Sequence, residues 1–152
     1  ARAIRRIRQL DHSAIFLLIA GSYTPLFMLL LPADQASGAL KLVWFFTLLG
    51  IAKTLLWPQS PGWITSLLAI AAGWCAVRYV LELAPVIGSV SFSLLVLSGV
   101  AYTVGGAVYA IRRPDPFPKT FGYHEVFHAL VIAGGLLHHA HLWMLLDTVG
   151  AI

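Results

Sequence analysis

The stretch Tyr123-His124-Glu125-Val126-Phe127-His128 stands directly before an uncharged run from Ala129 to Leu137. Two histidines at positions i and i+4 lie on one face of a helix, a little over one turn apart, so both imidazoles can reach a single metal ion. The letters also match H-E-x-x-H, the pattern of zinc peptidases in which the Glu is the general base. The uncharged run that follows indicates instead that these histidines begin a membrane-spanning helix.

The composition is that of a membrane protein. Of 152 residues, 59% are hydrophobic and 11% are charged, and the mean hydropathy is +0.84, which is far more apolar than a soluble domain. A span needs roughly 20 apolar residues, so this length allows about five spans with short connections. The net charge of +4 is explained by basic residues at span ends, which set topology and contact anionic lipid headgroups. We expect no nucleic-acid binding.

The uncharged segments predict an all-α, polytopic transmembrane helix bundle of five spans, forming a single integral-membrane domain over residues 1–152. A segment with four arginines begins the chain. The second span has a short uncharged run, confined between Lys41 and Lys53, so both lysines must snorkel for it to reach membrane length. We place Pro85 and Gly88 in the opening turn of the fourth span. The predicted spans cover about residues 12–32, 40–57, 63–81, 85–111 and 121–146.

Alternate threading of five spans puts the N-terminal arginines, Lys53 and the loop from Arg112 to Lys119 on one side of the membrane. That side carries eight of the ten basic residues, and the positive-inside rule makes it cytoplasmic. We therefore expect a multi-pass protein of the inner (plasma) membrane, in contact with membrane lipids and of undetermined oligomeric state. The same threading places Asp11, at the start of the first span, at the depth of His124 and His128.

Each of these candidates has a purely structural alternative. The pair His124 and His128 could be solvated at the membrane interface. Asp11 stands where a helix N-cap belongs, and Glu125 falls in a first helical turn, where a carboxylate meets the positive end of the helix dipole. On position alone, capping is the better explanation of Asp11.

A second histidine cluster follows on the last span, at His138, His139 and His141. At 1.5 Å per residue, His138 lies about 15 Å beyond His128 and cannot join the same coordination shell. We expect these three histidines at the outer membrane interface. A separate metal role is the alternative.

The segment from Leu10 to Pro25 (LDHSAIFLLIAGSYTP), together with Gly73-Trp74 and the closing H-x-x-x-H, resembles the bacterial hemolysin III family. Members of that family are similar to the progestin and adiponectin receptor (PAQR) proteins and, more distantly, to alkaline ceramidases. The resemblance covers nearly the whole chain. It implies a seven-helix membrane protein with its N-terminus inside and a cytoplasm-facing zinc site. There His124 and His128 would bind zinc, and Asp11 would hydrogen-bond the metal-bound water.

One part of the family pattern is missing from this sequence. The third zinc ligand of the family is a histidine in an S-x-x-x-H motif on its second span, and this chain begins where the third span would begin. We therefore expect an amino-terminally shortened chain that lacks two spans and shows two of the zinc ligands and one supporting acid.

These residues predict a chemistry as well as a site. Zinc lowers the pKa of its bound water towards about 7, and Asp11 would be the base that prepares this water for attack on a carbonyl. A site within reach of the bilayer favours a lipid amide or ester, so the leading hypothesis is a zinc-dependent lipid hydrolase. The alternatives are a pore-forming or cytolytic protein, a receptor or scaffold with a structural zinc, and an intramembrane peptidase using Glu125.

Overall fold

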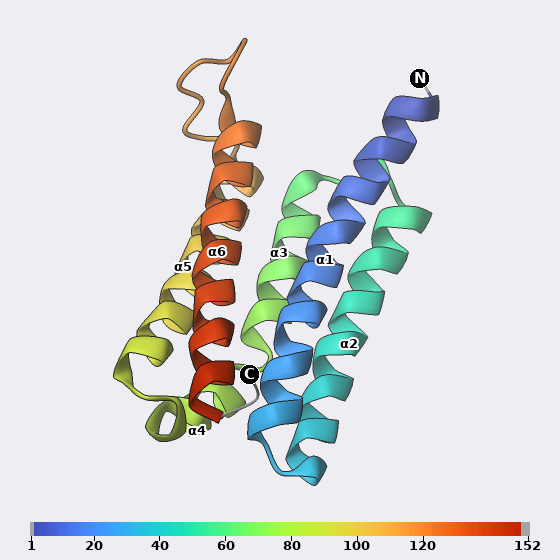
Figure 1. Cartoon of the computed structure of the whole chain (residues 1–152). Coiled ribbons are helices and arrows are strands. Elements are labelled where there is room, and N and C mark those ends of the chain that lie inside the picture. Colours follow the sequence, from blue (N-terminus) through green and yellow to red (C-terminus); the bar gives the residue numbers. More distant parts are fainter. Residues whose placement is uncertain (1, 150–152) are drawn as a thin grey trace. The chain divides into compact units, whose positions relative to one another are not determined.

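The computed structural model describes residues 2–149, although the side chains of Arg2, Arg5 and Arg8, three of the four predicted basic N-terminal residues, lie outside the described part. Within that range the chain is helical apart from short connections and one isolated bridge between Phe117 and Phe121. This confirms the predicted all-α fold. The helices are α1 (Arg2–Leu30), α2 (Ala33–Leu56), α3 (Gly62–Trp74), α4 (Val77–Ile87), α5 (Ser89–Ile111) and α6 (Tyr123–Val149) (Figure 1).

The chain divides into two compact units, residues 1–79 and 80–152. The first unit holds α1, α2 and α3 side by side (Figure 1). Phe16 of α1 is fully buried, and a Cβ built on Gly50 of α2 would lie 2.1 Å from its ring. The Thr47 hydroxyl donates to the carbonyl of Phe16 at 3.3 Å. Small residues of α2 therefore let the two helices approach closely, as is usual between helices in membranes.

Polar contacts join α3 to its neighbours in the same unit. The Tyr23 hydroxyl on α1 donates to the carbonyl of Gly73 at 2.6 Å. The ammonium group of Lys53 on α2 donates to the hydroxyl of Thr65 on α3. We expected the Lys53 side chain to extend from the second span toward the membrane surface. In the structure its ammonium group instead bonds α3.

The second unit is built on α5 and α6, which run side by side and are joined by the loop of residues 112–122 (Figure 1). A Cβ on Gly134 of α6 would lie 3.0 Å from the ring of Tyr102 on α5, and one on Gly105 of α5 would lie 3.3 Å from Leu130. Glycines on both helices therefore set the distance between them. The single domain expected for the whole chain stays a prediction.

Four helical segments are long and apolar enough to cross a membrane: Gln9–Leu30, Ala33–Leu56, Ser89–Ile111 and Tyr123–Asp147. A fifth is obtained if α3 and α4, which are bent at a break between them, count as one span. The third predicted span is therefore two helices and not one, with Cys75 and Ala76 between them. Pro85 lies inside α4 and not in the next helix, because the chain turns instead at Gly88, whose φ of +76° favours glycine.

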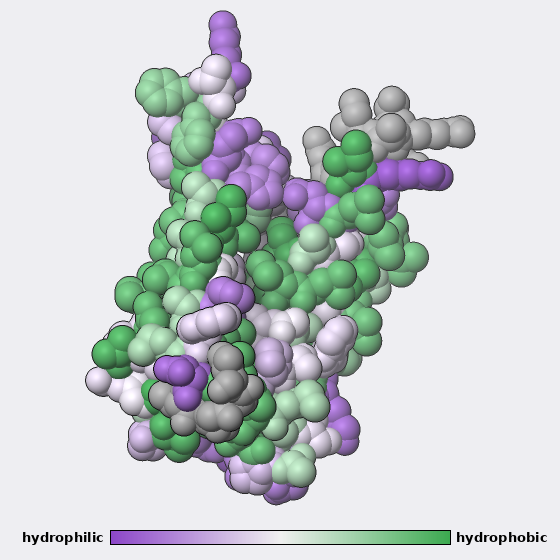
Figure 2. Space-filling view, in the orientation of Figure 1, coloured by the Kyte–Doolittle hydropathy of each residue, from purple (hydrophilic) through white to green (hydrophobic). Residues whose placement is uncertain are grey.

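The second helix also begins earlier than expected. It starts at Ala33 after Pro32, and Asp34 lies in its first turn, where a carboxylate meets the positive helix end. Apolar side chains stand exposed along the helices, including Phe45 and Leu48 of α2 and Ile132 and Leu136 of α6. The space-filling view shows hydrophobic residues along the sides of the helices (Figure 2). In a membrane these surfaces would face acyl chains.

Candidate metal centre

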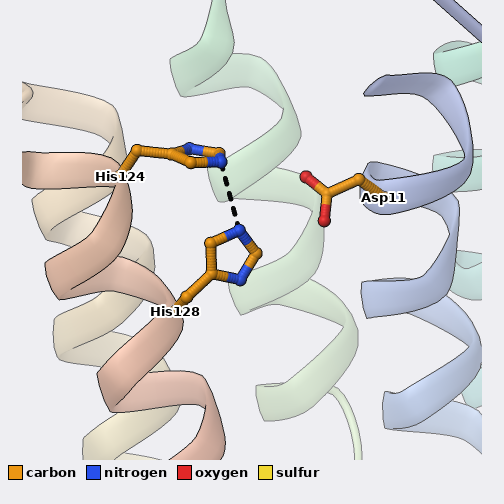
Figure 3. A group of neighbouring side chains, drawn as sticks. All are labelled: Asp11, His124 and His128. Atoms are coloured by element: carbon orange, nitrogen blue, oxygen red, sulfur yellow. Dashed lines mark hydrogen bonds between the residues drawn. The ribbon is translucent and has the colours of Figure 1, made fainter. Parts of the chain in front are cut away.

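The two predicted histidine ligands meet at the beginning of α6. The Nε2 atoms of His124 and His128 are 3.1 Å apart, and the two rings are nearly perpendicular, with centroids 4.6 Å apart. Both side chains are half-buried. Figure 3 shows the two rings turned toward each other from successive turns of the helix. Two nitrogens that each lie about 2.0–2.1 Å from a tetrahedral zinc are roughly 3.3–3.4 Å apart, so the pair fits one ion with a small adjustment.

The first turn of α6 is held in place by two carboxylates. Glu125 accepts a hydrogen bond from the N–H of Gly122 at 2.9 Å, as the third helical residue does in a capping box. Asp115, in the preceding loop, accepts one from the N–H of Tyr123 at 2.9 Å. A Cβ on Gly122 would lie 2.5 Å from the Asp115 carboxylate. The loop and the helix start thus fix the segment that carries both imidazoles.

This capping favours the structural interpretation of Glu125. Its carboxylate contacts the backbone at the start of the helix, as the structural alternative predicted. A general base in a peptidase would instead have to reach water at the metal. The H-E-x-x-H pattern therefore gains no support as a peptidase motif.

An aromatic side chain of α5 packs against the centre. The ring centroid of Tyr109 lies 5.9 Å from that of His124 and 5.2 Å from that of Phe127. Tyr109 and Asp115 were both missed at the level of sequence. Tyr109 is one aromatic residue in a long uncharged run and gives no signal, whereas Asp115 could have been suspected as an acid shortly before a predicted helix start.

Asp11 lies in the first unit, half-buried on α1. The expectation that it caps a helix is wrong, because α1 begins at Arg2 and Asp11 is well inside it. The basic N-terminal segment, which was expected to precede the span, continues the same helix. Figure 3 draws Asp11 on the ribbon of α1. Because it belongs to the other unit, its meeting with the histidine pair stays a prediction.

Helices of membrane-spanning length, with an imidazole pair in the first two turns of α6, define a multi-pass membrane protein with a candidate metal centre. The family described as haemolysin-III related matches residues 1–139, and the chain belongs to this family. The predicted family is thereby confirmed. The inner plasma membrane stays a prediction.

Individual relatives agree with this assignment. The chain is 31% identical over 125 residues to the Hemolysin-3 homolog of Bacillus subtilis (strain 168), an alignment that covers 82% of the chain and 56% of the relative. It is 30% identical over 128 residues to Hemolysin-3 of Bacillus cereus, covering 84% of the chain and 56% of that protein. The adiponectin receptor protein of Drosophila melanogaster is 27% identical over 99 residues, or 62% of the chain and 18% of the receptor.

The chain thus spans about half the length of the bacterial relatives that it matches. No match was found among solved structures.

Proposed function

We propose that this chain carries the centre of a zinc-dependent hydrolase that cleaves an amide or ester bond of a membrane lipid. The observation that carries the proposal is the spacing of 3.1 Å between the Nε2 atoms of His124 and His128 at the start of an apolar helix. Imidazole is a preferred zinc ligand, and two of them on successive turns of one helix can bind the same ion.

The donor atoms fit the metal. His124 and His128 offer imidazole nitrogens, which zinc prefers, and Asp11 would place a carboxylate beside the metal-bound water. The meeting of Asp11 with the pair is supported by topology. When α3 and α4 cross the membrane as one span, the first and last helices begin at the same face, since four crossings separate their starts.

The roles of the residues follow from their chemistry. Bound zinc would lower the pKa of a coordinated water to about 7 and polarise a carbonyl. Asp11 would accept a proton from the attacking water and return it to the leaving amine or alkoxide as the carbonyl carbon loses that group. His124 and His128 would hold their positions because Asp115 and Glu125 fix the first turn of α6.

The surroundings favour a lipid over a soluble substrate. The helix that carries the pair is apolar for membrane length, and Phe117 and Phe121 stand exposed in the adjoining loop. Aromatic side chains at this position suit the boundary between headgroups and acyl chains. A carbonyl in that boundary is one carried by a lipid, such as the amide of a ceramide or the ester of a lysophospholipid.

The test combines metal analysis with turnover. The protein is purified in detergent, its zinc is measured by elemental mass spectrometry, and it is incubated with a ceramide and with a lysophospholipid while free fatty acid is measured. The His124→Ala/His128→Ala variant should lose turnover and one equivalent of zinc relative to the unmodified chain. The His139→Ala variant, which changes an exposed histidine of the same helix, should keep both.

The Asp11→Asn variant tests whether Asp11 acts as a base or binds the zinc. If Asp11 is the base, Asp11→Asn should lower turnover by at least about 100-fold, since general base catalysis contributes about 10²–10⁴-fold. The variant should still bind zinc. Loss of zinc in this variant would make Asp11 a ligand. Full turnover with retained zinc would refute its role, and undiminished zinc in the double histidine variant would refute the centre.

Two other functions are weighed against this one. The bacterial relatives carry the name hemolysin, which suggests cytolysis, but a pore needs a polar path and the described helices expose apolar side chains. Release of a dye from liposomes would reveal one. A purely structural zinc is less favoured, because the start of α6 is already capped by protein groups.

A further inference from the structure

A second group of polar side chains lies between α5 and α6, away from the first turn of α6. His141 is fully buried, and His138 and Ser91 are 6% and 4% exposed. Of the three C-terminal histidines, His139 is exposed. Their expected position at the outer membrane interface stays a prediction. Buried imidazoles need hydrogen-bond partners or a ligand, because loss of water is otherwise uncompensated.

The hydrogen bonding of His141 is incomplete. Its Nδ1 atom lies 2.7 Å from the Ser91 hydroxyl oxygen. Its Nε2 atom is buried and has no hydrogen-bond partner among the residues that the structure describes. A neutral imidazole has one donor and one acceptor nitrogen. If Nδ1–H donates to Ser91, Nε2 presents a lone pair with nothing to receive it.

His138 supplies a second imidazole at the right distance. It precedes His141 by three positions, so both project from one face of α6. Their ring centroids are 5.7 Å apart. Two imidazoles that bind one ion with metal–nitrogen distances of about 2.0–2.1 Å have centroids roughly 5 to 6.5 Å apart, depending on the angle at the metal.

We propose that His138 and His141 bind a divalent transition metal ion, with Zn²⁺ as the reference case, at a site separate from the His124–His128 centre. The Nε2 lone pair of His141 is one ligand and His138 is the other, and water completes the shell. Ser91 accepts the Nδ1–H of His141 and so fixes the tautomer and ring orientation, as partners of metal-bound histidines do. The nearest members of the two centres, His128 and His138, are about 15 Å apart along the helix.

The proposal is tested in a background that lacks the first centre. The full chain with His124→Ala/His128→Ala is purified in detergent, stripped with chelator and titrated with Zn²⁺, and separately with Co²⁺, whose visible absorption reports nitrogen coordination. One equivalent should bind. Adding His141→Ala should abolish binding, and adding Ser91→Ala should weaken it about 10- to 100-fold. The matched control, His139→Ala, should leave affinity unchanged.

Several results would overturn the site. A folded background variant that binds no metal would refute the site. Binding that survives both His138→Ala and His141→Ala would place the ion elsewhere. If His141→Ala does not fold, the test uses Ser91→Ala, which removes only a hydroxyl group. Unchanged metal affinity in the Ser91→Ala variant would refute the proposed orienting role of Ser91. The outcome is independent of the proposed hydrolase, since the first centre is absent throughout.

Discussion

The contact between Gly50 and Phe16 makes α1 and α2 sensitive to a single methyl group. In Gly50→Ala the new Cβ would lie 2.1 to 2.4 Å from three atoms of the Phe16 ring, whereas carbon atoms in contact are ordinarily about 3.5–4.0 Å apart. The ring is fully buried, so it has no free space to enter. One of the two helices must move.

Two terms of opposite sign set the magnitude. Overpacking of a core costs typically about 1–3 kcal/mol, and this overlap, which exceeds 1 Å at three ring atoms, belongs near the upper end. Alanine gains up to about 1 kcal/mol over glycine in a helix. The net expectation is a free energy of unfolding lower by about 1–2 kcal/mol, or a 5- to 30-fold change in the folded-to-unfolded ratio.

Gly21→Ala on α1 is the matched control, because nothing lies within 4 Å of its added Cβ. It should be neutral or slightly stabilising. Unfolding is followed in detergent by far-ultraviolet circular dichroism during titration with denaturing detergent. Phe16→Leu should reduce the cost of Gly50→Ala, because a smaller side chain relieves the overlap. The reasoning is refuted if Gly50→Ala is as stable as Gly21→Ala, or if Phe16→Leu does not interact with it.

Three further outcomes are expected. Asp115→Ala should speed hydrogen exchange at the amide of Tyr123 and weaken zinc binding several-fold. It should also lower the free energy of unfolding by about 1 kcal/mol, as the loss of other helix caps does. Unchanged exchange would show that Asp115 does not cap α6. Gly134→Leu should separate α5 from α6, because even its Cβ would be 3.0 Å from the Tyr102 ring, whereas Gly99→Leu has open space; equal stability of the two variants would contradict this. Removing metal with chelator should leave the helix content unchanged, and melting of α6 would indicate a structural metal.

The helical fold could be predicted because its signal is long uncharged runs, and these agree with four of the membrane-length segments. The break between α3 and α4 was missed because neither Cys75 nor Ala76 is a helix breaker, so nothing local marks it. The start of α2 was placed too late because the second span was drawn around the uncharged run between Lys41 and Lys53, whereas Pro32 and Asp34 together suit a helix start.

Of the candidate site, the sequence could predict only the spacing of the two histidines along one helix. The positions of His124 and His128 determine that they share a helix face, and this arrangement needs no knowledge of the other helices. The contact of Tyr109 with His124 depends on how α5 packs against α6, and the burial of His138 and His141 depends on tertiary structure in the same way. Helix periodicity alone contains no information about either.

The carboxylates that cap α6 come from the same short segment as the imidazoles, since Asp115, Glu125, His124 and His128 lie within 14 consecutive positions. The proposed chelating pair is therefore positioned by contacts near in sequence, whichever way the distant helices pack. If zinc binds as proposed, the two imidazole nitrogens would stay in place while a third ligand dissociates and returns. Such an arrangement would suit a metal centre that must release one ligand to admit another molecule.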